Sequence, residues 1–489
     1  MKKILSNKFI CLAIIILIIA SFFRFYNLSK TLMFLDDQAR DVLKAAKILK
    51  EFDIPFIGPM ASTGNVYLGP IYYWAITPFL ALSGFNPVGP IIMVALLDIA
   101  SCLLLFWLLK KVFGLWPAFF AALLYSLSPL MVTTARFSWN PNPVPFFTLV
   151  WFFFILKFLE KARFRWIFGV GFALGILIQL HYVTGLLFFI TGLILFYWIV
   201  KNKAWREISF LGKIIGFLVL GILVPLVPFL LFEIKNAFIN TRAALDLIFG
   251  ANNASALPTN YFERVSLIID QLINQAWVLK YGGWFLLFCL ISLLIGLKEI
   301  KKRRSLILMA LVLFLPIFLT PLMLPGNEIH LHYLGFIMPF LFMMPAVAIY
   351  VWRQQLWGGL AAVVIIVCLV IAVNCLRVDW RSIVNIDSNH QVDRAKDLAN
   401  YIAAETKEKN IFVTSLTGSP FAYPTRYYLY LQGLDAHSDQ AKTVFAICDG
   451  GGCNPEGNPI WEIAQFGQLK TVDHRHVAYG TWIYQLEPK

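Results

Sequence analysis

Residues 9–53 read FICLAIIILIIASFFRFYNLSKTLMFLDDQARDVLKAAKILKEFD, and their character changes at the pair Asp36–Asp37. Before the pair, the stretch is apolar for long enough to form a membrane-spanning helix. After it, apolar residues recur at three- and four-residue steps, with lysine and arginine between them. This pattern predicts an amphipathic helix lying in a membrane interface. The two carboxylates therefore stand at the rim of a predicted membrane, where burying charge is costly.

The whole chain has the composition of a membrane protein. It has 489 residues, of which 59% are hydrophobic and 14% are charged, whereas soluble domains contain about 25% charged residues. Its mean hydropathy is +0.73. The net charge of +14 comes from lysines and arginines that cluster in short loops between apolar segments. That distribution is typical of cytoplasmic loops, and it does not indicate a nucleic-acid partner.

Eleven apolar segments are long enough to span a bilayer. They lie near residues 9–27, 88–109, 115–134, 143–159, 166–181, 183–200, 211–232, 277–297, 305–324, 333–351 and 357–376. If the N-terminus is cytoplasmic, every loop assigned to the cytoplasm is basic, so the orientation is consistent along the chain. The first segment has an isoleucine where signal peptidase prefers a small residue. We therefore expect it to be retained as a helix, with Arg24 as an interfacial anchor.

These segments predict an α-helical polytopic membrane protein with about eleven transmembrane helices, located in the plasma membrane. Residues 1–376 form the transmembrane domain, and residues 28–87 form its first outer loop. Residues 377–489 are more polar and alternate a helical pattern, QVDRAKDLANYIAAETKEK, with the strand-like runs NIFVTSL, TVFAICD and GTWIYQLEP. This alternation predicts a small extracytoplasmic α/β domain.

The aspartate pair has two explanations. An aspartate at the start of a helix accepts backbone N–H bonds and stabilises the helix by about 0.5–2 kcal/mol. One aspartate is enough for that role, and a second adjacent carboxylate adds repulsion, so the pair also suggests chemistry. The next stretch, residues 58–84, is rich in glycine, proline and tyrosine. Irregular backbone near membrane depth is tolerated where it lines a wet cavity, so Tyr72 and Tyr73 are candidates for the wall of such a cavity.

Other polar residues collect on the same predicted side of the membrane. They are Arg136, Asn140, His181, His330 and His332. Each alone fits an ordinary interfacial residue, but together they form a basic, hydrogen-bonding rim that complements the carboxylates. The His-x-His pair could belong to a metal site, but the sequence offers no nearby third ligand, and a divalent metal is not expected.

The order of these features resembles that of the GT-C glycosyltransferases, in particular the dolichyl-phosphate-mannose-protein mannosyltransferase-like and aminoarabinose-transferase-like families. One helix is followed by a loop that opens with an acidic pair, an interfacial helix, the run GPIYYW and about ten further helices. The motifs that carry the resemblance are DQARD (37–41), NPNPVPFF (140–147), the histidine at 181, and HYLGFIMP (332–339). The usual acidic pair in these families is Asp-Glu, whereas this chain has Asp-Asp-Gln. The key carboxylate of these families therefore corresponds to either Asp36 or Asp37 in this chain.

The resemblance implies a GT-C-like membrane glycosyltransferase that moves a sugar from a polyprenyl-phosphate carrier to an extracytoplasmic acceptor. Asp37 is the expected general base, with Asp36 as the alternative. Cations must meet the charge that grows on the leaving phosphate, and the candidates for this role are Arg136, His330 and His332. The residues expected around the substrate cavity are Tyr72, Tyr73, Asn140 and His181.

The resemblance implies no required cofactor. The acceptor is a protein, a lipid-linked glycan or a cell-wall polymer, and the sequence selects neither the acceptor nor the sugar. A lipid-linked glycan flippase or another transporter is the alternative function. Transporters tend to place ionisable residues near the bilayer midplane, between related repeats. This sequence places them mostly at the predicted outer rim and shows no repeat.

Cys448 and Cys453 lie in the run CDGGGCNPEGNP of the C-terminal domain. The predicted topology puts them in an oxidising compartment, and the three glycines allow a tight turn, so we expect a disulfide bond. A free thiol pair and a metal site stay open as alternatives. The other five cysteines lie in or beside apolar segments and are interpreted as small hydrophobic residues.

Overall fold

The computed structural model describes residues 2–489 except 62–65, 250–259, 300–302, 324–328 and 355–357. The chain divides into two compact units that do not follow the order of the sequence. Unit 1 comprises Met1–Tyr26, Pro55–Ala75 and Ile91–Ile386. Unit 2 comprises Asn27–Ile54, Ile76–Pro90 and Asp387–Lys489. The start of the first loop therefore belongs to the same unit as the C-terminal domain.

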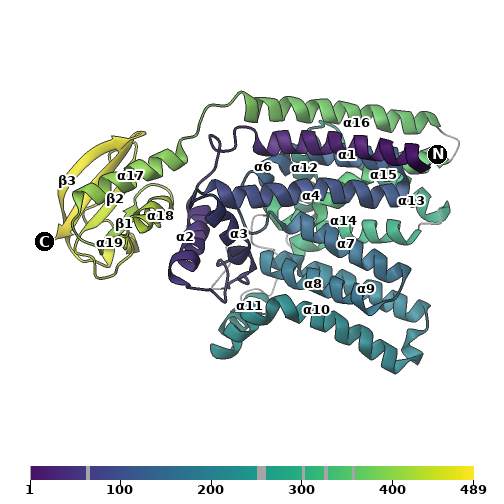
Figure 1. Ribbon diagram of the computed structural model, residues 1–489, viewed down its shortest axis with the longest axis horizontal. Helices are drawn as coiled ribbons and strands as arrows, with labels where there is room; N and C mark the ends of the chain where they lie inside the picture. Colours follow the sequence, from purple (N-terminus) through teal and green to yellow (C-terminus); the bar gives the residue numbers. More distant parts are fainter. Residues whose placement is uncertain (1, 62–65, 250–259, 300–302, 324–328, 355–357) are drawn as a thin grey trace. The chain divides into compact units, whose positions relative to one another are not determined.

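Unit 1 is a bundle of apolar helices lying side by side (Figure 1). Its α-helices, of which α3 and α4 are divided between the two units, are α1 (Lys2–Phe25), α3 (Ile71–Leu82), α4 (Val88–Phe113), α5 (Leu115–Leu127), α6 (Pro129–Ala135), α7 (Val144–Glu160), α8 (Phe164–Leu180), α9 (Leu186–Lys201), α10 (Ile208–Lys235), α11 (Ile239–Phe249), α12 (Tyr261–Trp277), α13 (Gly282–Glu299), α14 (Arg303–Met323), α15 (Met338–Gln354) and α16 (Gly358–Asp379). Short helical turns complete it: η1 (Tyr182–Gly185), η2 (Ala204–Arg206), η4 (Leu331–Ile337) and η5 (Trp380–Val384).

Each of the eleven predicted apolar segments coincides with an apolar helix or a bent pair of helices. In the described residues, six helices are long and apolar enough to cross a membrane, or up to eight if each bent pair is one span. Three further apolar helices are shorter. One bent pair is α5 and α6, which meet at 58°. Pro129 begins α6, and since proline has no N–H to donate, the helical hydrogen bonding is interrupted there.

Small residues let the helices of unit 1 approach closely. A methyl group on Gly171 of α8 would come within 2.1 Å of the carbonyl oxygen of Leu218 on α10. A methyl group on Gly221 of α10 would come within 2.2 Å of the carbonyl oxygen of Phe168 on α8. In a bilayer, helix association depends on such close packing, because lipid is as apolar as the side chains.

Arg24 is not an interfacial anchor, and the sequence-based interpretation of this residue is wrong. Its side chain is completely buried, and its guanidinium pairs with Asp98 of α4, with Nη2 to Oδ2 at 2.8 Å. Nη1 also donates to the carbonyl oxygen of Ser126. The hydroxyl of Tyr125 on α5 donates to the other carboxylate oxygen of Asp98 at 2.8 Å. This buried polar cluster joins α1, α4 and α5, and its charges are compensated, as burial requires.

Unit 2 contains a four-stranded sheet in the order β1-β2-β4-β3. Its strands are β1 (Phe412–Ser415), β2 (Val444–Asp449), β3 (Leu469–Ala478) and β4 (Thr481–Pro488), and its helices include α2 (Asp36–Glu51), α17 (Gln391–Glu405), α18 (Tyr423–Leu431) and α19 (Trp461–Ala464). The pair β1–β2 is parallel, and the other two pairs are antiparallel. The predicted small α/β domain is therefore confirmed, whereas α18, α19 and β3 were not predicted.

The helix α2 (Asp36–Glu51) begins at the predicted aspartates. Its apolar residues Ala39, Val42, Ala45 and Ala46 are buried, and α2 packs against α18. The amphipathic pattern was correctly identified as a helix. The surface that covers its apolar side is protein, whereas the sequence analysis expected the membrane interface.

Candidate functional site

A cluster of histidine and aromatic rings in unit 1 brings together three segments that are far apart in sequence. His181 lies between α8 and η1, Trp139 lies between α6 and α7, and His332 lies in η4. The ring of His332 lies 4.4 Å from that of Trp139 and 5.8 Å from that of His181, measured between centroids. The ring of His330 stacks on His332 at 5.5 Å. The structure therefore gathers the three predicted histidines.

The ring of Tyr333 packs near the rings of all three histidines. Its ring centroid lies 4.5 Å from that of His332, 5.2 Å from that of His181 and 5.5 Å from that of His330. His330 is exposed, whereas His332 is only partly exposed. A ligand can therefore reach His330 directly, while His332 is held by aromatic packing on several sides.

His181 takes part in the local backbone structure. It ends α8, and its Nδ1 accepts a hydrogen bond from the backbone N–H of Val183 at 3.3 Å, which caps η1. An Nδ1 that accepts a hydrogen bond carries no proton, so this contact corresponds to a neutral imidazole.

The segment NPNP connects the cluster to the rest of the bundle. Asn140 is buried, and its amide donates to the carbonyl oxygen of Leu180 at 2.8 Å, beside His181. The amide of Asn142 donates to the carbonyl oxygens of Thr134 and Phe137. The polar side chains of this motif therefore fix its irregular backbone, which proline residues keep from becoming helical.

Tyr72 and Tyr73, both predicted at the cavity wall, are buried. The hydroxyl of Tyr72 lies 2.7 Å from the hydroxyl of Ser138, which precedes Trp139. Tyr72 is thus hydrogen-bonded to the same loop that carries Trp139 and Asn140. Its hydroxyl supports this loop, and the role of both tyrosines toward a substrate stays a prediction.

Arg136 caps the end of α1. Its Nη1 donates to the carbonyl oxygens of Phe23, Arg24 and Tyr26 at 2.9–3.1 Å. The last carbonyls of a helix have no partner within the helix, so a cation there satisfies them and interacts favourably with the helix dipole. Arg136 is 8% exposed. Its side chain has a structural role that the sequence did not reveal, and its role toward a donor phosphate stays a prediction.

The aspartate pair lies in unit 2, and its two members have different partners. Asp36 Oδ1 accepts the backbone N–H of Tyr423, at the start of α18, at 2.7 Å. Asp37 Oδ1 pairs with Arg40 Nη1 at 2.8 Å, and the Asp37 side chain is 48% exposed. The start of α2 is capped by a third residue, Gln38, whose side chain accepts the N–H of Leu35 at 3.1 Å.

Arg40 also makes two contacts of 2.8–2.9 Å with Oδ1 of Asp41, a completely buried carboxylate. Sequence reasoning assigned no role to this pair, although both residues lie in the DQARD motif. Gln38 satisfies the N–H of Leu35, which precedes α2, and both aspartates lie in the first turn of the helix. Carboxylates are favoured there by the helix dipole, so the structural explanation of the pair stays open and its chemical role stays a prediction.

Two further observations concern metals and cysteines. Among the residues that the structure describes, no three His, Cys, Asp or Glu side chains are placed to hold one metal ion. Cys448 and Cys453 form a disulfide bond in unit 2. The bond ties the end of β2 to the loop that follows it.

Comparison with known sequences finds a matching family and two similar proteins. Residues 68–232 match the sequence profile of the dolichyl-phosphate-mannose-protein mannosyltransferase family. The chain is 23% identical over 253 residues to the candidate mannosyltransferase YkcB of Bacillus subtilis (strain 168), covering 50% of this chain and 34% of that protein. It is 24% identical over 206 residues to a second candidate mannosyltransferase of the same organism, YycA, covering 41% and 29%. The chain thus matches about a third of the length of these relatives.

Comparison with solved structures covers nearly the whole chain. The crystal structure of ArnT from Cupriavidus metallidurans bound to undecaprenyl phosphate has a TM-score of 0.62 and 13% identity, and the match covers 98% of this chain and 97% of that one. The archaeal oligosaccharyltransferase AglB from Archaeoglobus fulgidus, in complex with an inhibitory peptide and a dolichol-phosphate, has a TM-score of 0.53 and 10% identity, covering 90% and 69%. Both are GT-C glycosyltransferases. The predicted GT-C-like fold and the predicted resemblance are therefore confirmed.

Proposed function

We propose that this protein is a membrane glycosyltransferase that moves a sugar from a polyprenyl-phosphate carrier to an acceptor outside the cytoplasm. One observation carries the proposal. The segment that matches the mannosyltransferase family, residues 68–232, contains Tyr72, Trp139, Asn140 and His181, and these residues lie in one hydrogen-bonded and aromatic network. The segment that matches the family is therefore also the segment that supplies most of this polar and aromatic network.

The donor side of the reaction is assigned to unit 1. When the sugar is transferred, the bond between its anomeric carbon and the phosphate oxygen breaks, and the lipid phosphate leaves with an added negative charge. We assign Arg136, His330 and His332 to the stabilisation of this charge. His330 is the exposed member and would contact the phosphate directly. Support for a lipid-phosphate donor comes from the solved relatives, which were found with undecaprenyl phosphate or a dolichol-phosphate.

The acceptor side is assigned to unit 2. The acceptor hydroxyl attacks the anomeric carbon, forms the new glycosidic bond and gives its proton to a carboxylate. We assign Asp37 as this base, with Asp36 as the alternative. Asp37 is half-exposed, so a substrate can reach it, and Arg40 orients one of its oxygens. Asp36 accepts a backbone N–H, which holds one of its oxygens in place.

The test is donor consumption by the purified protein in lipid nanodiscs. Radiolabelled polyprenyl-phosphate sugars are supplied one at a time, and the release of polyprenyl phosphate and the labelled product are followed. The proposal expects one donor to be consumed, with activity retained in EDTA because no metal is assigned a role. Movement of the labelled lipid across the bilayer of sealed proteoliposomes, without cleavage, would contradict the proposal and support a flippase.

A further inference from the structure

Unit 2 encloses a pocket of about 220 Å³ at the carboxyl ends of the two parallel strands. Ser415 is the last residue of β1 and Asp449 the last of β2, and both line the pocket. In α/β folds, ligands bind in the crevice at the carboxyl ends of parallel strands. The pocket therefore lies where this architecture places ligands.

The start of the first loop forms one wall of this pocket. Phe34, Leu35 and Asp36 line it together with residues of α17 and the segment before α18. The segment is held in position by two hydrogen bonds within unit 2. Gln391 accepts the N–H of Phe34 at 2.7 Å, and Asp36 accepts the N–H of Tyr423 at 2.7 Å. One member of the aspartate pair thus belongs to the pocket.

The charges in the pocket select its ligand. Of the residues that line the pocket, Asp36 and Asp449 carry carboxylates and Arg394 carries a guanidinium. Arg394 pairs with Asp449, and its Nε donates to the hydroxyl of Thr481, which in turn donates to Asp449, both at 3.0 Å. The cation that lines the pocket is therefore already compensated. This lining disfavours a phosphate or an acidic sugar.

The rest of the lining has two kinds of surface. Hydroxyl and amide groups are supplied by Ser415, Thr417, Ser419, Thr425 and Gln391, and apolar surface by Phe34, Leu35, Ala395, Leu398 and Ile447. A sugar ring has hydroxyls at its edge and C–H groups on its faces, so it complements such a mixed lining. The volume lies below the range of about 300–1,000 Å³ that is usual for drug-sized ligands, which fits a single ring better than a peptide segment.

We propose that this pocket binds one neutral, hydroxyl-rich sugar unit of the acceptor, so that the acceptor is a glycan. This inference rests on the proposed function for the role of the sugar as an acceptor, whereas the binding itself does not depend on catalysis. Carboxylates accept hydrogen bonds from sugar hydroxyls, and such charge-assisted bonds are stronger than neutral ones. Asp449 and the hydroxyl of Thr417, which accepts the N–H of Asp449 at 3.0 Å, are the specificity-determining residues.

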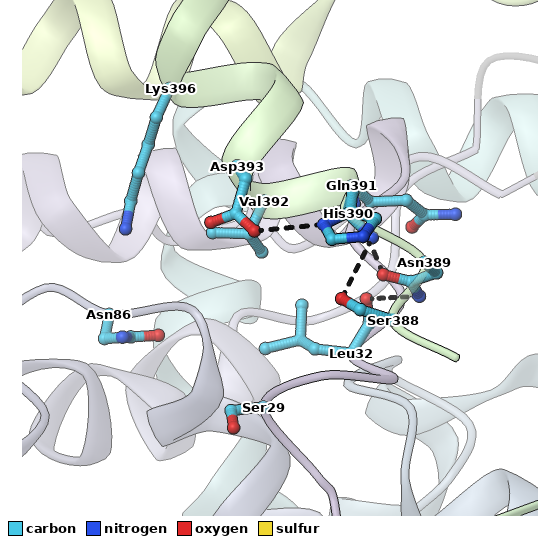
Figure 2. A pocket seen from close by; sticks show the side chains of 10 residues that line it. All are labelled: Ser29, Leu32, Asn86, Ser388, Asn389, His390, Gln391, Val392, Asp393 and Lys396. Carbon is cyan, nitrogen blue, oxygen red and sulfur yellow. Dashed lines mark hydrogen bonds and ion pairs between the residues drawn. The ribbon is translucent and has the colours of Figure 1, made fainter. Parts of the chain in front are cut away.

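A second pocket in unit 2 offers a matched control. It has a volume of about 140 Å³ and is lined by residues that include Ser388, His390, Asp393 and Lys396 (Figure 2). Figure 2 shows Asp393 directed toward His390, with their side chains 3.5 Å apart. Asp393 does not line the larger pocket. Since Asp393 and Asp449 are both partly exposed carboxylates that pair with a basic side chain, the same Asp-to-Asn change can be made in each pocket.

The experiment measures binding of methyl glycosides to the full-length protein in nanodiscs, without donor, by saturation-transfer NMR. The probes are the methyl glycosides of mannose, glucose, galactose and N-acetylglucosamine, and methyl glucuronide as the acidic probe. We expect saturable binding of at least one neutral glycoside and weaker binding of the glucuronide. Asp449→Asn and Thr417→Val should each lower the affinity for the neutral glycoside about tenfold. Asp393→Asn should leave this affinity unchanged.

Three results would overturn the inference: no saturable binding of any neutral glycoside, equal binding of the acidic one, or wild-type binding in both pocket variants. Donor consumption is measured on the same samples. If the donor is consumed but no glycoside binds, the pocket assignment fails and the proposed function stands. If a glycoside binds with the expected variant effects but no donor is consumed, the pocket stands and the proposed function fails.

Discussion

Replacing Asp37 by asparagine should abolish transfer while leaving the protein folded. Asparagine keeps the size of the side chain and removes the proton acceptor. A positioned general base contributes about 10²–10⁴-fold to a rate, and donor consumption should fall by that factor. Asp36→Asn should have a smaller effect if Asp37 is the base, because the asparagine oxygen can still accept the N–H of Tyr423.

The structure limits what Asp37→Asn can do to stability. In the part of the chain that the structure describes, the ion-pair partner of Asp37 is Arg40, and the two side chains are 48% and 25% exposed. An ion pair with this exposure contributes about 0–1 kcal/mol. Arg40→Gln is the contrasting variant, because it also removes the cation that pairs with the buried carboxylate of Asp41. Reducing the compensation of a buried charge is costly, so this variant should unfold at a lower temperature than Asp37→Asn.

The assay combines initial rates of donor consumption with a thermal unfolding curve for each variant. A large loss of rate in Asp37→Asn with an unchanged unfolding temperature indicates a catalytic role for this carboxylate. If the rate falls only in parallel with stability, as Arg40→Gln would show, the carboxylate is structural. The assignment is wrong if Asp36→Asn and Asp37→Asn both retain near-normal transfer.

Three further predictions follow from other contacts. Arg136→Gln and His332→Gln should each slow donor consumption at least about tenfold, since a hydrogen bond to a charged group contributes about 1.5–3 kcal/mol; unchanged kinetics in both would remove them from the donor site. Asp98→Asn should lower the stability of unit 1 by about 3–5 kcal/mol, because its guanidinium partner stays buried, and a thermal shift of less than a few degrees would contradict this. Burial and the neighbouring Arg426 lower the pKa of His437 in the folded protein. The neutral His437 therefore contributes fully to stability above the unperturbed histidine pKa of about 6.5, and this contribution is lost as the pH falls below that value. Replacing His437 by glutamine should flatten this dependence in unfolding curves recorded between pH 5 and 8.

The helices of unit 1 were predictable because their signal is local. A run of apolar residues long enough to span a bilayer indicates a helix whatever it packs against. The break between α5 and α6 was missed, although Pro129 could have located it. The helices α11 and α12, which follow the predicted segment 211–232, were not predicted.

The errors concern partners that lie far away in sequence. Arg24 has the pattern of an interfacial anchor, but its partner Asp98 lies 74 positions away. Apolar residues at helical spacing along α2 indicate a covered face, and this pattern is the same whether lipid or protein covers it. The observed cover is α18, which begins 387 positions after Asp36. No local pattern could have distinguished these outcomes.

The same reasoning explains how far the site could be predicted. The three histidines were identified from separate motifs, and the structure brings their rings together. Trp139 was missed although it precedes Asn140, because a tryptophan near a membrane surface is common and carries no signal alone. Arg136 was recognised as a cation, but its bonds to the end of α1 depend on tertiary structure.

The division into two units separates the two halves of the proposed reaction. The candidates for donor binding, Arg136, His330 and His332, belong to unit 1, and the aspartate pair belongs to unit 2 together with the C-terminal sheet. The pocket at the ends of β1 and β2 also includes Asp36. A change in the loops after these strands should therefore alter which acceptor is used without altering which donor is consumed. For this reason, acceptor specificity should follow the C-terminal domain, and donor specificity should follow the helical bundle.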